Sequence, residues 1–272
     1  MNNFYDSSKK FSISQNLRDV INNPKLIWTI SIIDLKLKYK KSILGPLWSL
    51  LNPLLTSLIV FFVFGRVFTG YLPGDGSYFF MVFSGFTLLM FLIQGIPNTA
   101  NSMNSYLPVV LNYRLNPLIA AQALGLAQAL SFLIATFAVV FTGVFFTEGI
   151  SVRILLLPLF LFFCSLFISG ISMILFHYYR RFDDAAYLFN VLIMVITYLS
   201  PFFYPIEALG NRTRFLVELN PFTSFIFTYR WLIESNGQIE IRNILVVVFG
   251  STILYLMGLF HMRHKWNETV ML

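Results

Sequence analysis

Long apolar stretches without Asp, Glu, Lys or Arg alternate along the chain with short polar stretches. A helix that crosses about 30 Å of hydrocarbon needs about 20 residues of this kind. Six stretches meet the requirement, and we predict spans at residues 43–66, 77–96, 118–147, 154–177, 185–205 and 242–262. The pattern therefore predicts an all-α integral membrane protein whose six transmembrane helices occupy residues 43–262.

The third stretch is longer than a membrane requires. Residues 115–147 contain no Asp, Glu, Lys or Arg over 33 positions. A straight helix of that length would measure about 50 Å. The pair Asn116-Pro117 is typical of a helix start, because proline is well tolerated in the first turn. We therefore expect this helix to begin at Pro117, with residues 97–116 as the loop before it.

Residues 25–41, within a polar N-terminal tail of residues 1–42, carry several lysines and two helical apolar stripes, at positions 26/30/33/37 and 28/32/35/39. The pattern predicts an amphipathic helix in the membrane interface, with one stripe on lipid and the other on protein. Alternation of apolar and polar residues from Ile33 to Lys40 would also fit a strand, but its open edges near lipid would be costly. A plain basic anchor for anionic lipid would explain the lysines but not the second stripe.

Residues 206–230, between the fifth and sixth predicted spans, contain a second short apolar segment. Leu219 to Tyr229 is free of charge over 11 residues, which is too short to cross a membrane. Asn220-Pro221 is again typical of a helix start. We expect external helices that dip into the membrane and form a gate, followed by Arg230 and Glu234 on one helical face at i, i+4.

Composition and charge agree with this reading and orient it. Hydrophobic residues make up 57% of the 272 positions and charged residues 11%, which excludes a water-soluble globule. The tail, the loop at 97–116, the turn at 177–184 and the end at 261–272 hold 13 Lys or Arg, whereas the opposite side holds 6. Positive charge favours the cytoplasmic side. Both termini, including a tail at 263–272, are therefore predicted to be cytoplasmic.

Several chemistries have no motif in the sequence. No glycine is followed by lysine, so the phosphate loop of many ATPases is missing, and no HExxH zinc motif occurs. We expect no catalytic residue, no metal site and no cofactor in this chain. The predicted spans also lack charged residues at mid-depth, which disfavours ion-coupled transport.

Four motifs occur in order along nearly the whole chain. They are LKLKYKKSILGPLWSLLNP at Leu35–Pro53, YRRFDDAAYLFN at Tyr179–Asn190, LSPFFYP at Leu199–Pro205 and LNPFTSFIFTYR at Leu219–Arg230. In these motifs the chain resembles the membrane subunits of ABC transporters that export lipid-linked polysaccharides such as O-antigen, capsule or teichoic acid.

This resemblance implies a channel-forming subunit in a bacterial inner or plasma membrane. It implies a homodimer of this chain, two copies of an ABC ATPase that binds ATP and Mg, a lipid-linked polysaccharide substrate, contact with membrane lipids and no nucleic acid. The loop at 97–116 corresponds to the ATPase-coupling segment. The residues expected to contact the ATPase are Asn104, Tyr106, Leu107, Pro108, Leu111, Asn112, Tyr113, Arg114, Lys36, Lys38, Lys40, Arg180, Arg181 and Asp183.

Two further sets of residues complete the prediction. A polar glycan needs hydrogen-bonding groups and flat aromatic faces along its path, for which the candidates are Asn52, Thr56, Ser57, Phe64, Tyr198, Ser200, Phe202, Phe203 and Tyr204. The candidates for the external gate are Asn220, Pro221, Phe222, Phe225 and Arg230.

Two alternatives stay open at this stage. The same fold could export a small hydrophobic drug or a lipid through a dry, apolar path. A membrane-embedded transferase could instead use Asp183, Asp184 and His177, which are predicted to lie at one membrane surface.

Overall fold

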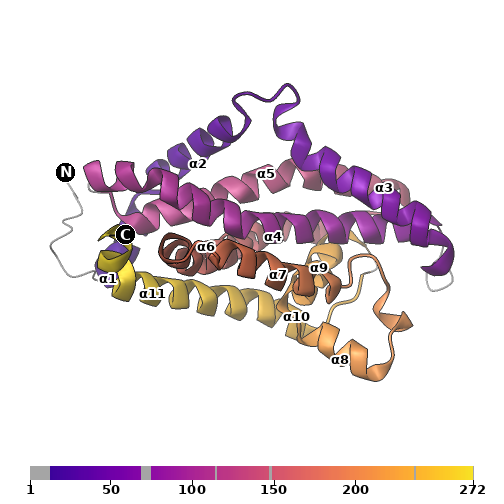
Figure 1. Cartoon of the computed structure of the whole chain (residues 1–272). Helices are drawn as coiled ribbons and strands as arrows, with labels where there is room; N and C mark the ends of the chain where they lie inside the picture. Colours follow the sequence, from indigo (N-terminus) through magenta and orange to yellow (C-terminus); the bar gives the residue numbers. More distant parts are fainter. Residues whose placement is uncertain (1–12, 69–74, 114, 147–148, 236, 272) are drawn as a thin grey trace.

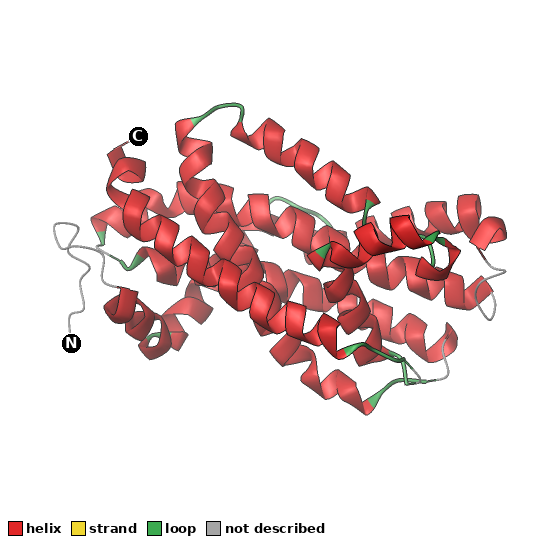
Figure 2. Ribbon diagram, turned by 90° about the horizontal axis from the view of Figure 1, so that it is seen from below, coloured by secondary structure: helices red, strands yellow, loops and turns green. Residues whose placement is uncertain are grey.

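The fold is all-helical over the residues that the structure describes. A computed structural model describes residues 13–68, 75–113, 115–146, 149–235 and 237–271. Helices and loops account for this part of the chain, and its only β-type contact is a single bridge between Ile150 and Glu234 (Figure 2). The predicted all-α class is confirmed for the described residues.

Long helices run between two ends of the molecule, and the described parts of the chain nearest the two termini, α1 and the end of α11, lie at the same end (Figure 1). Five helical stretches are long and apolar enough to cross a membrane, at residues 45–67, 76–112, 117–146, 152–181 and 241–271. The elements that form them are η1 (Gly45–Leu47), α3 (Trp48–Phe68), α4 (Asp75–Asn112), α5 (Pro117–Phe146), η3 (Val152–Leu156), α6 (Leu157–Arg181), α10 (Ile241–Leu245), the π-helical η5 (Val246–Gly250) and α11 (Ser251–Met271). The shorter elements are α1 (Ile13–Asn22), α2 (Pro24–Tyr39), α7 (Ala185–Tyr198), η4 (Ile206–Ala208), α8 (Asn211–Leu219) and α9 (Pro221–Ile233).

The fifth predicted span, 185–205, is not a helix of spanning length. Its helix α7 has 14 residues, or about 21 Å, and stops before Pro201. Proline disfavours helical geometry in the residue before it, and Ser200 bonds back to the Ile196 carbonyl at 2.8 Å. The segment still passes from one end of the molecule to the other. Before it, Arg181 pairs with Glu268 near the end of α11, and near its own end the Phe203 carbonyl accepts a hydrogen bond from Tyr78 at the start of α4. The crossing therefore combines a short helix with a non-helical stretch.

Two predicted non-membrane segments are helical instead. Residues 97–112 were expected in a loop, but α4 continues through Pro97 and Pro108 to Asn112 over 38 residues. Buried side chains at Ala100, Met103, Leu107 and Val110 recur at helical spacing and hold this extension against the bundle. Likewise, the predicted tail at 263–272 belongs to α11 as far as Met271, the last described residue.

The predicted helix at 25–41 is confirmed as α2, but its buried face differs from both expected stripes. The side chains that face the protein are Ile27, Ile30, Ser31 and Asp34. Ser31 donates a hydrogen bond to the Ala123 carbonyl of α5 at 2.8 Å, which explains why a polar residue occupies this face. Of the eight residues in the predicted stripes only Ile30 is buried, and Trp28, Ile33 and Leu37 are exposed. The surface of α2 that is free to contact lipid is therefore larger than predicted.

Small residues allow a close contact between α6 and α11. A Cβ atom added to Gly258 would clash with the Gly170 carbonyl oxygen. On α6, serines bond to two other helices: Ser172 donates to the Ile96 carbonyl of α4 at 2.8 Å, and Ser169 donates to the Ala121 carbonyl of α5 at 3.2 Å. Small and hydroxyl-bearing residues are typical of helix interfaces in membranes, where apolar contact with lipid already satisfies large side chains.

Replacing Gly258 by alanine should destabilise the protein by about 1–3 kcal/mol, because the two backbones must move apart. The matched control is Gly250→Ala, about two turns earlier at the end of η5, where the added Cβ would meet its nearest neighbour at 3.9 Å. Thermal unfolding of the two purified variants measures the difference. Equal midpoints would contradict the close-contact interpretation.

Candidate functional site

The predicted ATPase-coupling residues of α4 and α6 lie at the end of the molecule that carries both termini, whereas Lys38 of α2 contacts Gln128 farther along the bundle. The last turns of α4, α6 and α11 share one apolar cluster there, which includes Leu107, Phe176 and Trp266. Outside the cluster Leu111 and Tyr113 are exposed, and Tyr113 exposes 68% of its surface.

The remaining predicted contact residues divide between structural and exposed positions. Arg180 donates to the Thr269 carbonyl at 2.8 Å, and Arg181 pairs with Glu268, so both arginines tie α6 to α11. Those on the surface besides Leu111 and Tyr113 are Lys36, Lys38, Lys40, Pro108, Asn112 and Asp183, while Asn104 and Tyr106 are half-buried and Arg114 lies outside the described residues.

A polar contact joins α2 to the middle of the bundle. The Lys38 ammonium donates to the Gln128 side chain of α5 at 3.1 Å. Asp34 lies one turn earlier in α2. Partial removal of the two charged groups from water raises the pKa of Asp34 and lowers the pKa of Lys38, whereas the attraction between the two groups opposes both shifts. Gln128 lies in the apolar stretch of α5, so this contact places a polar group at the wall of a groove.

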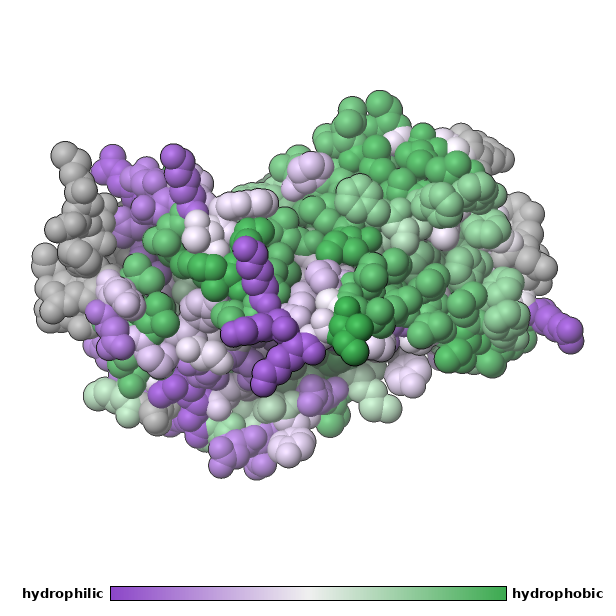
Figure 3. Space-filling view, turned by 90° about the horizontal axis from the view of Figure 1, so that it is seen from above, coloured by the Kyte–Doolittle hydropathy of each residue, from purple (hydrophilic) through white to green (hydrophobic). Residues whose placement is uncertain are grey.

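We call this groove the inner groove. It encloses about 70 Å³ between α2, α3, α4 and α5, and it is lined by Lys38, Trp48, Ser49, Asn52, Pro53, Thr87, Met90, Phe91, Gln94, Gly95, Asn98, Gln128, Ser131, Phe132 and Ala135. Figure 3 shows the face above it, where hydrophilic side chains gather at the centre and at the end with the termini, while apolar side chains cover the other end.

Hydrogen-bonding groups and aromatic faces meet in the inner groove. The hydroxyls of Thr87 and Ser131 are buried and have no partner among the described residues. The rings of Phe91 and Phe132 stack with centroids 4.4 Å apart. Buried polar groups without a partner are costly, so their presence in a groove indicates a ligand or water that completes them.

Among these groove residues only Asn52 was proposed from the sequence for the path, and Lys38 was assigned to the ATPase contact. The other path candidates came from α3 and from the aromatic segment after α7, whereas most of the groove lining comes from α4 and α5. A usable signal was present in α4, where Thr87, Phe91, Gln94 and Asn98 follow one another at spacings of four, three and four residues. This spacing puts them on one helical face.

The other predicted path residues lie elsewhere. Thr56 bonds to the Asn52 carbonyl at 3.0 Å within α3, and Ser57 is fully buried. Phe64, near the far end of α3, packs on Phe203 with ring centroids 5.6 Å apart. Phe202 and Tyr204 are buried, while Tyr198 is exposed at the end of α7.

The predicted gate segment forms a helix as expected. Asn220 caps α9 by accepting from the backbone nitrogen of Phe222 at 3.0 Å, and Pro221 occupies the first turn. Asn220 also donates to Ser200 at 3.0 Å, so a predicted gate residue and a predicted path residue are in contact. Phe222 and Phe225 are buried against Phe167 of α6, and α9 is therefore anchored in the core along this face.

From the sequence, Arg230 and Glu234 were expected together on one helical face, but no ion pair joins them in the described structure. Arg230 is buried and donates to the carbonyls of Met81 at 2.7 Å and Pro201 at 3.2 Å, and to the Ser84 hydroxyl at 3.3 Å. The helix ends at Ile233, and Glu234 adopts an extended conformation. The i, i+4 relation that the prediction assumed therefore does not hold.

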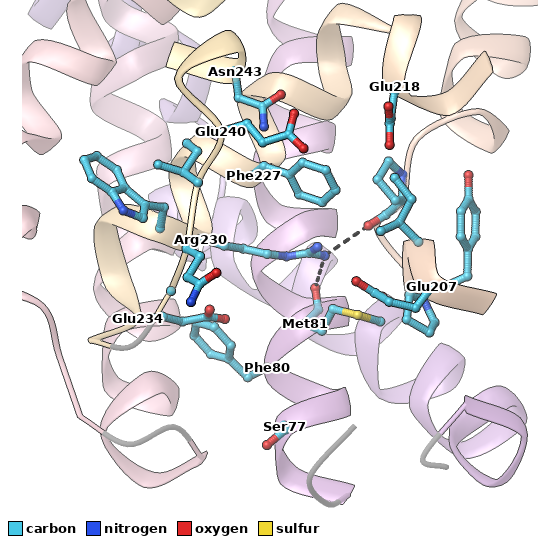
Figure 4. A pocket seen from close by; sticks show the side chains of 18 of the residues that line it. Ser77, Phe80, Met81, Glu207, Glu218, Phe227, Arg230, Glu234, Glu240 and Asn243 are labelled. Atoms are coloured by element: carbon cyan, nitrogen blue, oxygen red, sulfur yellow. Dashed lines mark hydrogen bonds between the residues drawn. The ribbon is translucent and has the colours of Figure 1, made fainter. Parts of the chain in front are cut away.

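Beside Arg230 lies a second hollow, the outer cavity, of about 730 Å³ (Figure 4). It opens at the end opposite the termini, between the start of α4, the segment around Tyr204, and helices α8 to α10. Its charged lining residues are Glu207, Arg214, Glu218, Arg230, Glu234, Glu240 and Arg242. Burial raises the pKa of Glu234, whereas hydrogen bonding from Arg214 lowers the pKa of Glu218.

The residues proposed for a transferase do not form a site of this kind. His177 is buried and its Nδ1 lies 2.6 Å from the Thr269 hydroxyl. Asp183 and Asp184 are exposed in the turn after α6. None of the three lines the inner groove or the outer cavity.

Comparison with known families decides the class of protein. The family model described as ABC-2 type transporter matches residues 25–233, which is most of the chain. The matched range includes the whole lining of the inner groove and the lining of the outer cavity up to residue 233. The chain belongs to the ABC-2 type transporter family. It is a multi-pass membrane protein and a transport subunit, and such membrane domains typically lack nucleotide binding and work with ABC ATPase partners.

Two relatives of this permease carry a more specific name. Both are O-antigen export system permease proteins RfbA from Klebsiella pneumoniae, 26% identical over 236 residues and 25% identical over 237 residues. Each alignment covers 86% of this chain and 89% of the relative.

The Asn220 contacts yield a stability prediction for the permease. Asn220→Ala removes the cap of α9 and the bond to Ser200, and should cost about 1–2 kcal/mol. Asn211→Ala, at the exposed first position of α8, is the matched control and should leave the thermal midpoint nearly unchanged. If both variants unfold at the temperature of the unchanged permease, the contact has no stabilising role.

Proposed function

We propose that this permease forms, as a homodimer with two copies of an ABC ATPase, the path by which a lipid-linked polysaccharide leaves the cytoplasm. The observation that carries the proposal is the inner groove, a polar and aromatic recess among helices long enough to span a membrane. The relatives named as O-antigen export permeases support the same substrate class.

The chemistry of the inner groove suits a sugar chain better than a drug or a lipid. A sugar presents hydroxyls that both donate and accept, and apolar faces that stack on aromatic rings. The groove supplies amides at Asn52, Gln94 and Gln128 beside the stacked Phe91 and Phe132. A hydrophobic cargo would leave the Asn52 amide and the buried hydroxyls of Thr87 and Ser131 without a ligand partner, which is costly in a site that excludes water.

Two apolar helices supply the surface for a second copy and for lipid. Helix α3 exposes Leu55, Ile59 and Phe62, and α7 exposes Leu188 and Val191. In our proposal part of this surface packs against the partner protomer and encloses the inner groove, and the rest faces lipid tails. The proposed orientation puts both termini in the cytoplasm, as the distribution of basic residues favours.

The proposed coupling site is the exposed end of α4. ATP binding closes the ATPase dimer, and the movement reaches the path through a continuous helix, because α4 carries both Leu111 at its end and Gln94 in the inner groove. Only an interaction that differs between the two states can drive such a change.

Gln94→Leu should reduce polysaccharide export strongly, by about tenfold or more, while assembly with the ATPase is retained. Gln94 is exposed in the single chain and lines the inner groove, so the change removes hydrogen bonding without disturbing the core. Cell-surface glycan measured in a strain that depends on this permease gives the readout. Asn211→Leu, outside both hollows, is the control, and unimpaired export by Gln94→Leu would contradict the assigned path.

A cysteine at Tyr113 should crosslink to the ATPase. Tyr113 is 68% exposed at the end of α4, whereas Leu216, 53% exposed on α8, lies at the opposite end of the molecule. The native Cys164 is fully buried and gives little background. Crosslinking from a cysteine at position 216, and none from position 113, would show that the proposed orientation and coupling site are both wrong.

A further inference from the structure

The outer cavity has the size and lining of a ligand site. It shares no lining residue with the inner groove, and the function proposed above assigns it no role. Its volume of about 730 Å³ falls within the range of about 300–1,000 Å³ that is usual for small-ligand sites. Its walls come from four parts of the chain that are distant in sequence, and Figure 4 shows their side chains converging on one space.

Arg230 is the buried cation of this cavity. Only 9% of its surface is exposed, and its guanidinium reaches across the cavity (Figure 4). The Nε and Nη2 atoms donate to Ser84, Met81 and Pro201. Arg230 also lines the cavity, so its guanidinium can donate to an acceptor on a ligand as well.

Carboxylates next to this guanidinium make the deep part of the cavity negative. Glu207 and Glu234 both act electrostatically on Arg230, so two carboxylates face one cation. Nearer the rim, Glu218 pairs with Arg214 at 2.8 Å, and Arg242 lies 3.4 Å from both Glu218 and Glu240. Four glutamates and three arginines line the cavity in all, which leaves a net charge of −1.

This arrangement selects against anions and favours hydroxyls. A free anion would accept from Arg230 but would be repelled by Glu207 and Glu234. A hydroxyl can accept from the guanidinium through its oxygen and donate its hydrogen to a carboxylate. Rings of Phe80, Phe227 and Trp231 in the lining provide apolar surface for the C–H face of a sugar ring.

We infer that the outer cavity binds uncharged, hydroxyl-rich sugar residues, and that the exported glycan is therefore neutral over the stretch that enters it and not a polyanion. This inference rests on the proposed function, because it names the class of glycan. It assigns the outer cavity as a second sugar-binding site, at the opposite end of the permease from the coupling site. Glu207 and Arg230 contact the sugar.

The test measures binding to the purified permease–ATPase complex by titration calorimetry. The probes are neutral dextran oligosaccharides and anionic oligogalacturonate of similar length. We expect saturable binding of the neutral probe and at least tenfold weaker binding of the anionic one. Comparable affinity for both probes, or no binding of the neutral probe, overturns the inference.

Variants place the binding in the outer cavity. Glu207 is exposed at the cavity wall, so Glu207→Ala should fold normally and weaken the neutral probe about tenfold. Glu207→Lys changes the net charge of the cavity from −1 to +1 and should improve binding of oligogalacturonate. Glu268→Ala, at the opposite end of the molecule beside Arg181, is the matched control and should bind like the unchanged permease. Unchanged binding by both Glu207 variants overturns the assignment.

The proposed function and the cavity assignment are tested by separate experiments. Glycan export in cells tests the proposed function, and calorimetry tests the outer cavity. If cells export a polysaccharide through the permease but Glu207→Ala binds the neutral probe normally, the cavity assignment is wrong and the proposed function stands. If the cavity binds the neutral probe but the permease exports no polysaccharide, the proposed function is wrong.

Discussion

The bonds of Arg230 to two backbone carbonyls hold together the parts of the molecule that lie at the end opposite the termini. The non-helical stretch after α7 exposes backbone groups that an α-helix would satisfy internally. In a membrane such groups need partners from the protein. Arg230 supplies one to Pro201, Tyr78 donates to the Phe203 carbonyl at 2.8 Å, and Ser200 is bonded by Asn220 at 3.0 Å. These contacts allow a crossing whose helix is only 14 residues long.

The same contacts define the floor of the outer cavity and connect it to α4. Arg230 bonds to Met81 and Ser84 of α4, and the next turn of that helix carries Thr87 of the inner groove. One helix therefore lines both hollows, and its far end carries the proposed coupling segment. Gly85 leaves the room for this arrangement, since a Cβ there would lie 2.5 Å from the guanidinium and 2.9 Å from the backbone of Phe202.

Features of the fold that depend on local sequence patterns could be predicted, whereas those that depend on tertiary contacts could not. Charge-free stretches located the five long helices, and Asn-Pro pairs located the starts of α5 and α9, because both signals are local. The end of α7 and the extension of α4 depend on tertiary contacts. The loop predicted at residues 97–116 is helical as far as Asn112, because burial of Met103 and Leu107 maintains the helix. Arg230 was read as an exposed partner of Glu234, since nothing local in the sequence shows that carbonyls of α4 and residue 201 meet it.

The candidate site was found only in part for a related reason. Aromatic residues are so abundant, at 18% of the chain, that their type alone does not distinguish a path from packing. The polar residues of the inner groove are more informative, because each uncharged polar group in an apolar helix needs a partner. Thr87 and Ser131 have none within the described residues, whereas Ser200, predicted to line the path, is fully bonded within the protein. Ser57 also lacks a partner among the described residues, but it is fully buried and does not line the groove, so an unmet hydrogen bond points to a ligand only where the group borders a hollow. The path that we propose therefore uses groups of α4 and α5 that border the inner groove, while the aromatic segment after α7 packs on α4 through Phe202 and Phe86.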